Sequence, residues 1–141
     1  VDQQGLEFEA AYTMENGFYT DLNFNIVSGD EILTTGTRQQ YRFLPSDNLN
    51  LTVGKRFGEE LDLSWEVVAR ASFDDEVPPD NSAPGYSLHN LRATYIPQQG
   101  VLEGTEIRLG IQNVFDTDVR PRRSTRQRSV RKVFLTLTKT F

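Results

Sequence analysis

The fold is decided by one stretch near the end of the chain, Val133-Phe134-Leu135-Thr136-Leu137-Thr138-Lys139-Thr140-Phe141. Apart from Phe134, apolar residues occupy every second position of its first half, and threonines occupy the positions between them. A period of two places successive side chains on opposite faces of a β-strand. We therefore expect a strand with one apolar and one mainly polar face, which ends on the aromatic side chain of Phe141.

The same period recurs along the whole chain and predicts about seven strands. They are expected at residues 5–14, 18–27, 48–57, 61–73, 86–96, 105–115 and 130–141. No helical period of 3.6 residues competes with this alternation over a long window. The sequence therefore predicts an all-β protein in which successive strands pair antiparallel.

The predicted connections alternate between short and long. Asn16-Gly17 is a strong signal for a tight hairpin, and residues 58–60 form a second short turn. Longer segments follow the second, fourth and sixth strands, so they leave the opposite end of the sheet. Outer-membrane β-barrels have this arrangement, with short periplasmic turns and long outer loops. We therefore expect an antiparallel transmembrane β-barrel segment of up-and-down strands.

The apolar face could meet a soluble core or lipid, and two patterns favour lipid. First, aromatic residues lie near the predicted strand ends, where headgroups would be. They are Phe18, Phe57, Tyr95 and Phe141 at the short-turn end, and Phe73, Tyr86 and Phe115 at the other. Second, Lys55, Arg131 and Lys139 also lie near strand ends, where long cations can reach the interface.

The other face is polar and suits a wide, water-filled or plugged barrel. Its residues are Glu7, Glu9, Asp21, Asn23, Asn25, Arg56, Asp62, Glu66, Arg70, Arg92, Glu106, Arg108 and Gln112. A soluble antiparallel sheet would share this alternation. It would not explain the final Phe, the one-sided long loops or the two aromatic belts.

Composition restricts the remaining function classes. The 141 residues contain no cysteine, so neither a disulfide nor a thiolate metal site is expected. No apolar run reaches the length of a transmembrane helix, whereas a spanning strand needs only about 10 alternating residues. The net charge is −5, made up of 7 basic and 20 acidic residues in 1–119 and 8 basic residues alone in 120–141. The acidic first part argues against nucleic acid as a partner.

Four pieces of the sequence resemble the C-terminal part of TonB-dependent outer-membrane receptors. GYSLHNLRATY at 85–95 is similar to a strand of that family, and LGIQNVFD at 109–116 is similar to the strand end G-(V/I)-x-N-(L/V)-F-(D/N). Arg120-Pro121 falls where the family loop often reads Y-x-P, and the last strand through Phe141 is the fourth piece. The resemblance covers residues 85–141 by motif and the whole chain by strand pattern.

The resemblance implies a 22-stranded barrel around an N-terminal plug, which imports iron chelates such as siderophores or haem across the outer membrane of a Gram-negative bacterium. Residues 1–141 would be its last seven strands, without the plug through which the TonB complex acts. The implied partners are outer-membrane lipid, lipopolysaccharide and the barrel assembly machinery. In the family that machinery reads a C-terminal signal, which here corresponds to Val133, Leu135, Leu137 and Phe141.

A basic cluster before the last strand is the densest chemical feature. It comprises Arg120, Arg122, Arg123, Arg126 and Arg128, followed by Arg131 and Lys132. Arginine suits bidentate capture of phosphate or carboxylate. An anionic ferric chelate, haem propionates, lipopolysaccharide phosphate and plain solvent all remain open as what the cluster meets.

Other candidate sites are weaker. Asp74, Asp75, Glu76 and Asp80 could bind calcium but have no EF-hand spacing, so a solvated loop is preferred. His89, the single histidine, is expected on the apolar face at the interface rather than as a haem ligand. No catalytic or metal-ligand pattern is present, so we expect neither an enzyme nor a cofactor. The alternatives are a soluble β-barrel or sandwich that binds a small apolar ligand and, less favoured, an outer-membrane enzyme.

Overall fold

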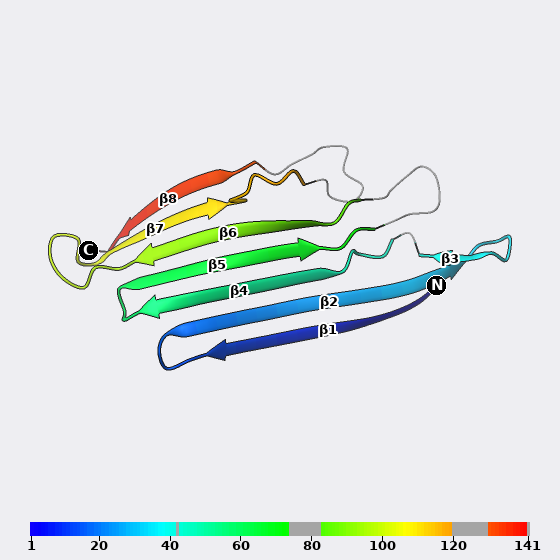
Figure 1. Cartoon of the computed structure of the whole chain (residues 1–141), viewed down its shortest axis with the longest axis horizontal. Helices are drawn as coiled ribbons and strands as arrows, with labels where there is room; N and C mark the ends of the chain where they lie inside the picture. The colour runs from blue at the N-terminus through cyan, green and yellow to red at the C-terminus, as the bar shows by residue number, and fades with distance from the viewer. Residues whose placement is uncertain (42, 74–82, 120–129, 141) are drawn as a thin grey trace.

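The computed structural model describes residues 1–41, 43–73, 83–119 and 130–140, and within them every regular element is a β-strand. The strands are β1 (Asp2–Thr13), β2 (Phe18–Ile32), β3 (Arg38–Gln40), β4 (Asn48–Phe57), β5 (Leu61–Arg70), β6 (Tyr86–Tyr95), β7 (Thr105–Gln112) and β8 (Lys132–Lys139). They form one antiparallel sheet, drawn as a single twisted layer in Figure 1. The described residues contain no helix that could cross a membrane.

The sheet is an up-and-down meander. Its strands lie in the order β1-β2-β4-β5-β6-β7-β8, and β3 pairs with the C-terminal end of β2. The turns after β1, β4 and β6 leave one end, and the longer connections after β2, β5 and β7 leave the other (Figure 1). This confirms the predicted alternation. β1 and β8 lie on opposite edges and do not pair with each other, so the sheet is not closed into a barrel.

The first hairpin turns at Glu15-Asn16-Gly17, where the sequence predicts it, but as a three-residue loop and not as the two-residue turn that Asn-Gly favours, because Asn16 does not have a positive φ. Gly17 has a φ of 87°, a conformation that glycine adopts without steric cost. The amide of Phe18 donates to Oδ1 of Asn16 at 3.1 Å, and the amide of Arg56 in β4 donates to the Gly17 carbonyl at 2.9 Å. The turn is therefore tied both to itself and to the next strand in the sheet.

The expected count of seven strands omits β3. Here β2 continues beyond Val27 to Ile32, and Arg38–Gln40 folds back against it. Arg38 forms an ion pair with Asp30 at 2.8 Å, and Gln39 donates to Glu31 at 2.7 Å. Both side-chain pairs connect β2 with β3. The sequence did not predict this hairpin, because it has too few apolar residues to give a period-two pattern.

Four strands are shorter than predicted, β6 by one residue only, and two aromatic assignments were wrong. β5 ends at Arg70, β7 at Gln112, and β8 covers only Lys132–Lys139. Phe73 lies past the end of β5, forms an isolated bridge with Ala83 and is only 6% exposed, so it is not part of an exposed aromatic belt. Tyr86 pairs with Arg70 and therefore belongs to the polar face.

The buried apolar residues of the described chain gather at the end with the long connections. They are Leu44, Phe73, Ala83 and Val119, all of which lie outside the strands. Hydrophobic burial thus orders the base of the long connections, whereas the strands are held mainly by their hydrogen-bonded register. The rest of the sheet has no packed interior on either side within the described residues.

Candidate functional site

Most apolar side chains of the seven long strands share one face of the sheet, where they are exposed or half-buried. Residues directly opposite each other in an antiparallel ladder point to the same face. One such row runs Lys55, Leu63, Ala93, Leu109 and Leu135 across five strands. Leu109, midway along β7, is 47% exposed, and Leu135 on the edge strand β8 is 62% exposed. Of the described residues, none forms a second layer over this face (Figure 1).

The sequence-based division into faces is thereby confirmed. Leu63, Val67, Leu109 and Leu137 do not converge on a common dry centre, because they lie side by side on one open surface. Phe18, Phe57 and Tyr95 are exposed on it at the short-turn end, as predicted. At the other end the expected belt reduces to Phe115, with His89 and Trp65 beside it.

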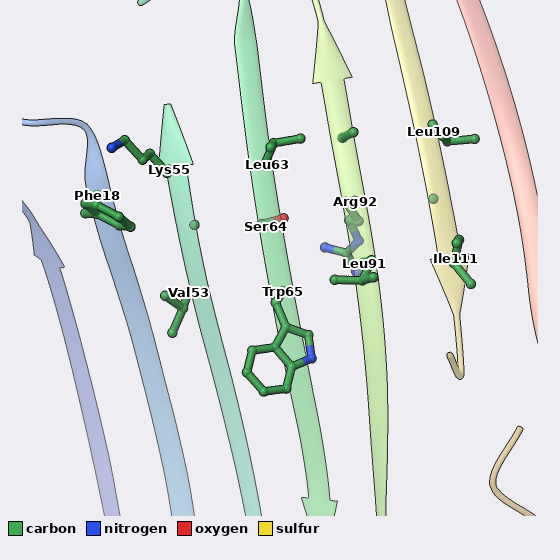
Figure 2. A pocket seen from close by; sticks show the side chains of 13 residues that line it. Phe18, Val53, Lys55, Leu63, Ser64, Trp65, Leu91, Arg92, Leu109 and Ile111 are labelled. Carbon is green, nitrogen blue, oxygen red and sulfur yellow. The ribbon is translucent and has the colours of Figure 1, made fainter. Parts of the chain in front are cut away.

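A shallow depression of about 460 Å³ lies on the apolar face. The small side chain of Ala93 leaves a gap between Leu63 and Leu109 in its row, and Trp65, Leu91 and other apolar residues border the gap (Figure 2). Most of the lining is apolar, and Lys55 stands at the side nearest the short turns.

Lys55 is the charged residue of the depression. Its Nζ lies 4.4 Å from the centre of the Phe18 ring and 5.0 Å from that of Phe57. Contacts of this kind attract a cation to the negative face of an aromatic ring. Lys55 forms no ion pair within the described residues. Its ammonium is therefore held on an apolar surface without an anionic partner from the described chain.

The opposite face is polar and bonded across the strands. The Tyr19 hydroxyl donates to Oδ1 of Asp62 at 2.8 Å, and the guanidinium of Arg56 lies 4.8 Å from the centre of the Tyr19 ring. Further along, Oε2 of Glu66 accepts from Asn90 at 2.7 Å and from Arg92 at 3.0 Å. Many charged groups on this face are thus paired with polar or oppositely charged neighbours.

Two glycines of the polar face lie under aromatic rings. The ring of Tyr19 covers Gly54, and the ring of Phe134 covers Gly110, so that a Cβ at either glycine would overlap the ring. Both pairs belong to the same register row, which runs from Thr13 in β1 to Phe134 in β8. Aromatic side chains over glycines are a known way to stabilise strand pairing and fix register. This also accounts for Phe134, the aromatic residue that interrupts the polar phase of the last strand.

His89 lies on the apolar face, opposite Val67, as the sequence predicts. Its ring stacks on Trp65 at 5.5 Å and meets the edge of Phe115 at 4.9 Å. Nε2 lies 3.4 Å from the Ser87 hydroxyl, whereas Nδ1 is buried and has no hydrogen-bond partner among the described residues. No group of three metal-ligating side chains occurs among the described residues.

The Asn-Val-Phe-Asp motif forms a structural turn at the end of β7. Asn113, which is 2% exposed, has a φ of 51° and exchanges two hydrogen bonds with the backbone of Thr117 at 2.9 and 3.0 Å. The backbone amide of Asn113 donates to Oδ1 of Asn90 at 2.9 Å. The backbone amide of Arg131 donates to Oδ1 of Asp116 at 2.8 Å. The sequence identified the motif only by resemblance, and the burial of Asn113 was not foreseen.

Several predicted sites lie outside the described residues. These are Arg120, Arg122, Arg123, Arg126 and Arg128, the acidic Asp74, Asp75, Glu76 and Asp80, and Phe141. The other three residues of the predicted assembly signal, Val133, Leu135 and Leu137, share the apolar face of edge strand β8. No protein-family model, curated protein or solved structure matches this chain.

Proposed function

We propose that this chain is a membrane-spanning part of an outer-membrane transport receptor, the C-terminal strands of a TonB-dependent receptor that takes up an iron chelate such as a siderophore or haem. In this proposal, lipid covers the apolar face and the polar face lines the lumen. The sheet would be one section of a wide barrel, and the strands that continue it would pair with its open edge at β1.

The observation that carries the proposal is the bare apolar face. It extends over all seven long strands, from Leu6 and Phe8 in β1 to Leu137 in β8, and these side chains are exposed. Soluble monomers rarely expose a continuous apolar surface larger than roughly a few hundred Å². A spanning strand, in contrast, alternates lipid-facing and lumen-facing residues in this way.

The polar face supports the same proposal. Its charges are paired between neighbouring strands, for example Arg56 with Asp62 at 3.5 Å and Arg92 with Glu66 at 3.0 Å. The long connections, which would be the outer loops, all leave one end of the sheet (Figure 1). The iron-chelate specificity rests on the sequence resemblance alone.

A second candidate is a soluble protein that binds a small apolar ligand. The observation in its favour is the apolar depression near Ala93, whose volume of about 460 Å³ falls in the usual range of ligand pockets. In that case the apolar face would have to be covered by further protein, since the described residues leave it open.

Dependence on a membrane separates the two candidates. The full chain would be refolded by dilution from urea, either into buffer or into phospholipid vesicles. We expect it to aggregate in buffer, and in the second case to stay with the vesicles through a high-pH wash that removes peripheral proteins. A monodisperse 16.1 kDa protein in buffer that does not sediment with vesicles would overturn the membrane proposal. Sequencing the gene upstream for a plug domain then tests the receptor assignment.

A further inference from the structure

We infer that the depression on the apolar face is a binding site for one anionic phospholipid, with its phosphate at Lys55 and an acyl chain in the hollow. The inference rests on the proposed function, because the occupant comes from the bilayer that would cover this face. It goes beyond general lipid contact, because it assigns one headgroup charge and one place in the sheet.

The first support is the shape of the surface. Ala93 lies between Leu63 and Leu109 in the row that also contains Lys55, and the shortage of side-chain volume there produces the hollow (Figure 2). The neighbouring row toward the middle of the sheet contains Val53, Trp65, Leu91 and Ile111. A flexible hydrocarbon chain fills an irregular apolar gap of this kind and restores the contacts that a gap forfeits.

The second support is charge complementarity. The Lys55 ammonium stands at the short-turn side of the hollow, fixed over two aromatic rings and without an ion pair in the described residues. An ammonium on an apolar surface is favourable only if its tip reaches water or an anion. A lipid phosphate at the interface supplies that anion, and its acyl chain then runs from the interface toward the strand middle.

Lys139 provides an internal contrast. It lies on the same face at the short-turn end, opposite Thr105, but its Nζ donates to the Glu103 carbonyl. It is also on the edge strand and does not line the hollow. The two lysines therefore lie on the same face, toward the same end of the sheet, but in different surroundings. They distinguish a built site from general attraction of anionic lipid to a cation.

The experiment uses Trp65, the only tryptophan of the chain, which lines the hollow. The full chain is inserted into phosphatidylcholine vesicles that contain a minor fraction of lipid with an acyl chain brominated near its carbonyl end. The brominated lipid is either phosphatidylglycerol or phosphatidylcholine at the same fraction. Bromine quenches tryptophan on contact, so the excess quenching by phosphatidylglycerol measures preference at the site.

We expect phosphatidylglycerol to occupy the site about fivefold more strongly, the preference that one interfacial lysine supplies. Lys55→Gln should abolish the preference, whereas Lys139→Gln should leave it intact. Ala93→Leu should also reduce it by filling the hollow, whereas Ala69→Leu, on the same face but outside the hollow, should not.

Equal quenching of the wild-type chain by the two brominated lipids would overturn the inference and leave the membrane proposal standing. If Lys55→Gln and Lys139→Gln lowered the preference for phosphatidylglycerol equally, general attraction of anionic lipid to cations would explain it, and the inference of a site at Lys55 would be overturned. A preference that survives Ala93→Leu would exclude seating in the hollow. If neither lipid quenches Trp65 because the chain does not enter vesicles, the membrane proposal fails as well.

Discussion

The two faces of this sheet are made by alternate residues of the same strands, yet they are satisfied in different ways. On the polar face, Tyr19, Asp62, Glu66 and their neighbours bond to each other across strands. On the apolar face, the described side chains have contacts along the sheet and nothing above them. The polar face is therefore largely satisfied within the described chain, whereas the described residues leave the apolar face uncovered. The predictions below test that difference.

The largest effect, on membrane insertion, is expected when a charged residue is placed on the apolar face and not when one is removed from the polar face. Leu109 belongs to the apolar face. Arg108 belongs to the polar face, where it lies opposite Thr94 and Thr136. Leu109→Arg should strongly reduce insertion into vesicles, because an arginine on the lipid-facing side of a barrel costs up to about 2–4 kcal/mol, depending on its depth. Arg108→Leu should reduce insertion much less. The fraction of protein that sediments with vesicles after a high-pH wash measures both.

The two variants change charge in opposite directions, so Leu109→Gln and Arg108→Gln are matched controls that separate charge from polarity. If insertion responded equally to the changes at 108 and 109, lipid would not distinguish the two faces. The assignment of the apolar face to the membrane would then have to be withdrawn.

A smaller effect is expected from the aromatic contacts of the polar face. Gly54→Ala should displace the Tyr19 ring and weaken its hydrogen bond with Asp62, with a loss of about 1–3 kcal/mol in the free energy of unfolding. In a Tyr19→Ala background the same substitution should be neutral or stabilising, because alanine restricts the unfolded chain more than glycine. Urea unfolding in micelles supplies the four free energies of the double-mutant cycle.

Additive losses in that cycle would show that the ring and the glycine act independently. The contact would then have no part in holding β2 against β4, and the register of the two strands would rest on their backbone hydrogen bonds alone.

The smallest effect is expected for Glu66→Gln. The glutamine keeps the shape of the side chain but removes the charge that faces Asn90 and the half-exposed Arg92. Because exposed ion pairs contribute little, the free energy of unfolding should fall by about 0.5–1 kcal/mol. The urea midpoint in micelles measures it, with Glu9→Gln, whose carboxylate accepts from Asn23 alone, as the comparison. A loss as large as that of Gly54→Ala would mean that the polar face depends on ionic pairing.

Most of the sheet could be predicted from sequence because period two determines both the strands and their faces. Asn48–Phe57 and the start of β5 at Leu61 agree with expectation to the residue. The strands predicted too long are those in which alternation continues by chance past the last paired residue, whereas the extension of β2 and the short strand β3 were missed. Phe73 keeps the apolar phase of β5, but the chain has already left the ladder at Arg70 and buries the ring instead.

The site was harder to predict because its features depend on neighbours in other strands. The alternating pattern identifies Ala93 as apolar, but the hollow exists only because Leu63 and Leu109 are opposite it. The same holds for the glycines under Tyr19 and Phe134. In the sequence of its own strand, each glycine only lowers the strand propensity. Asn113 was recognised in a motif, but its burial depends on Asn90 and Thr117. Cross-strand register supplies this information, and a lone sequence does not.

The order of the strands has a consequence for how the sheet forms. Each long strand pairs with its nearest long neighbours in the sequence, and β3 is a short branch on β2. Such local contacts have a low entropic cost of closure, which favours rapid folding. The sheet can therefore form by adding one strand at a time to the strand before it. The last strand, β8, needs only β7 in place to pair with.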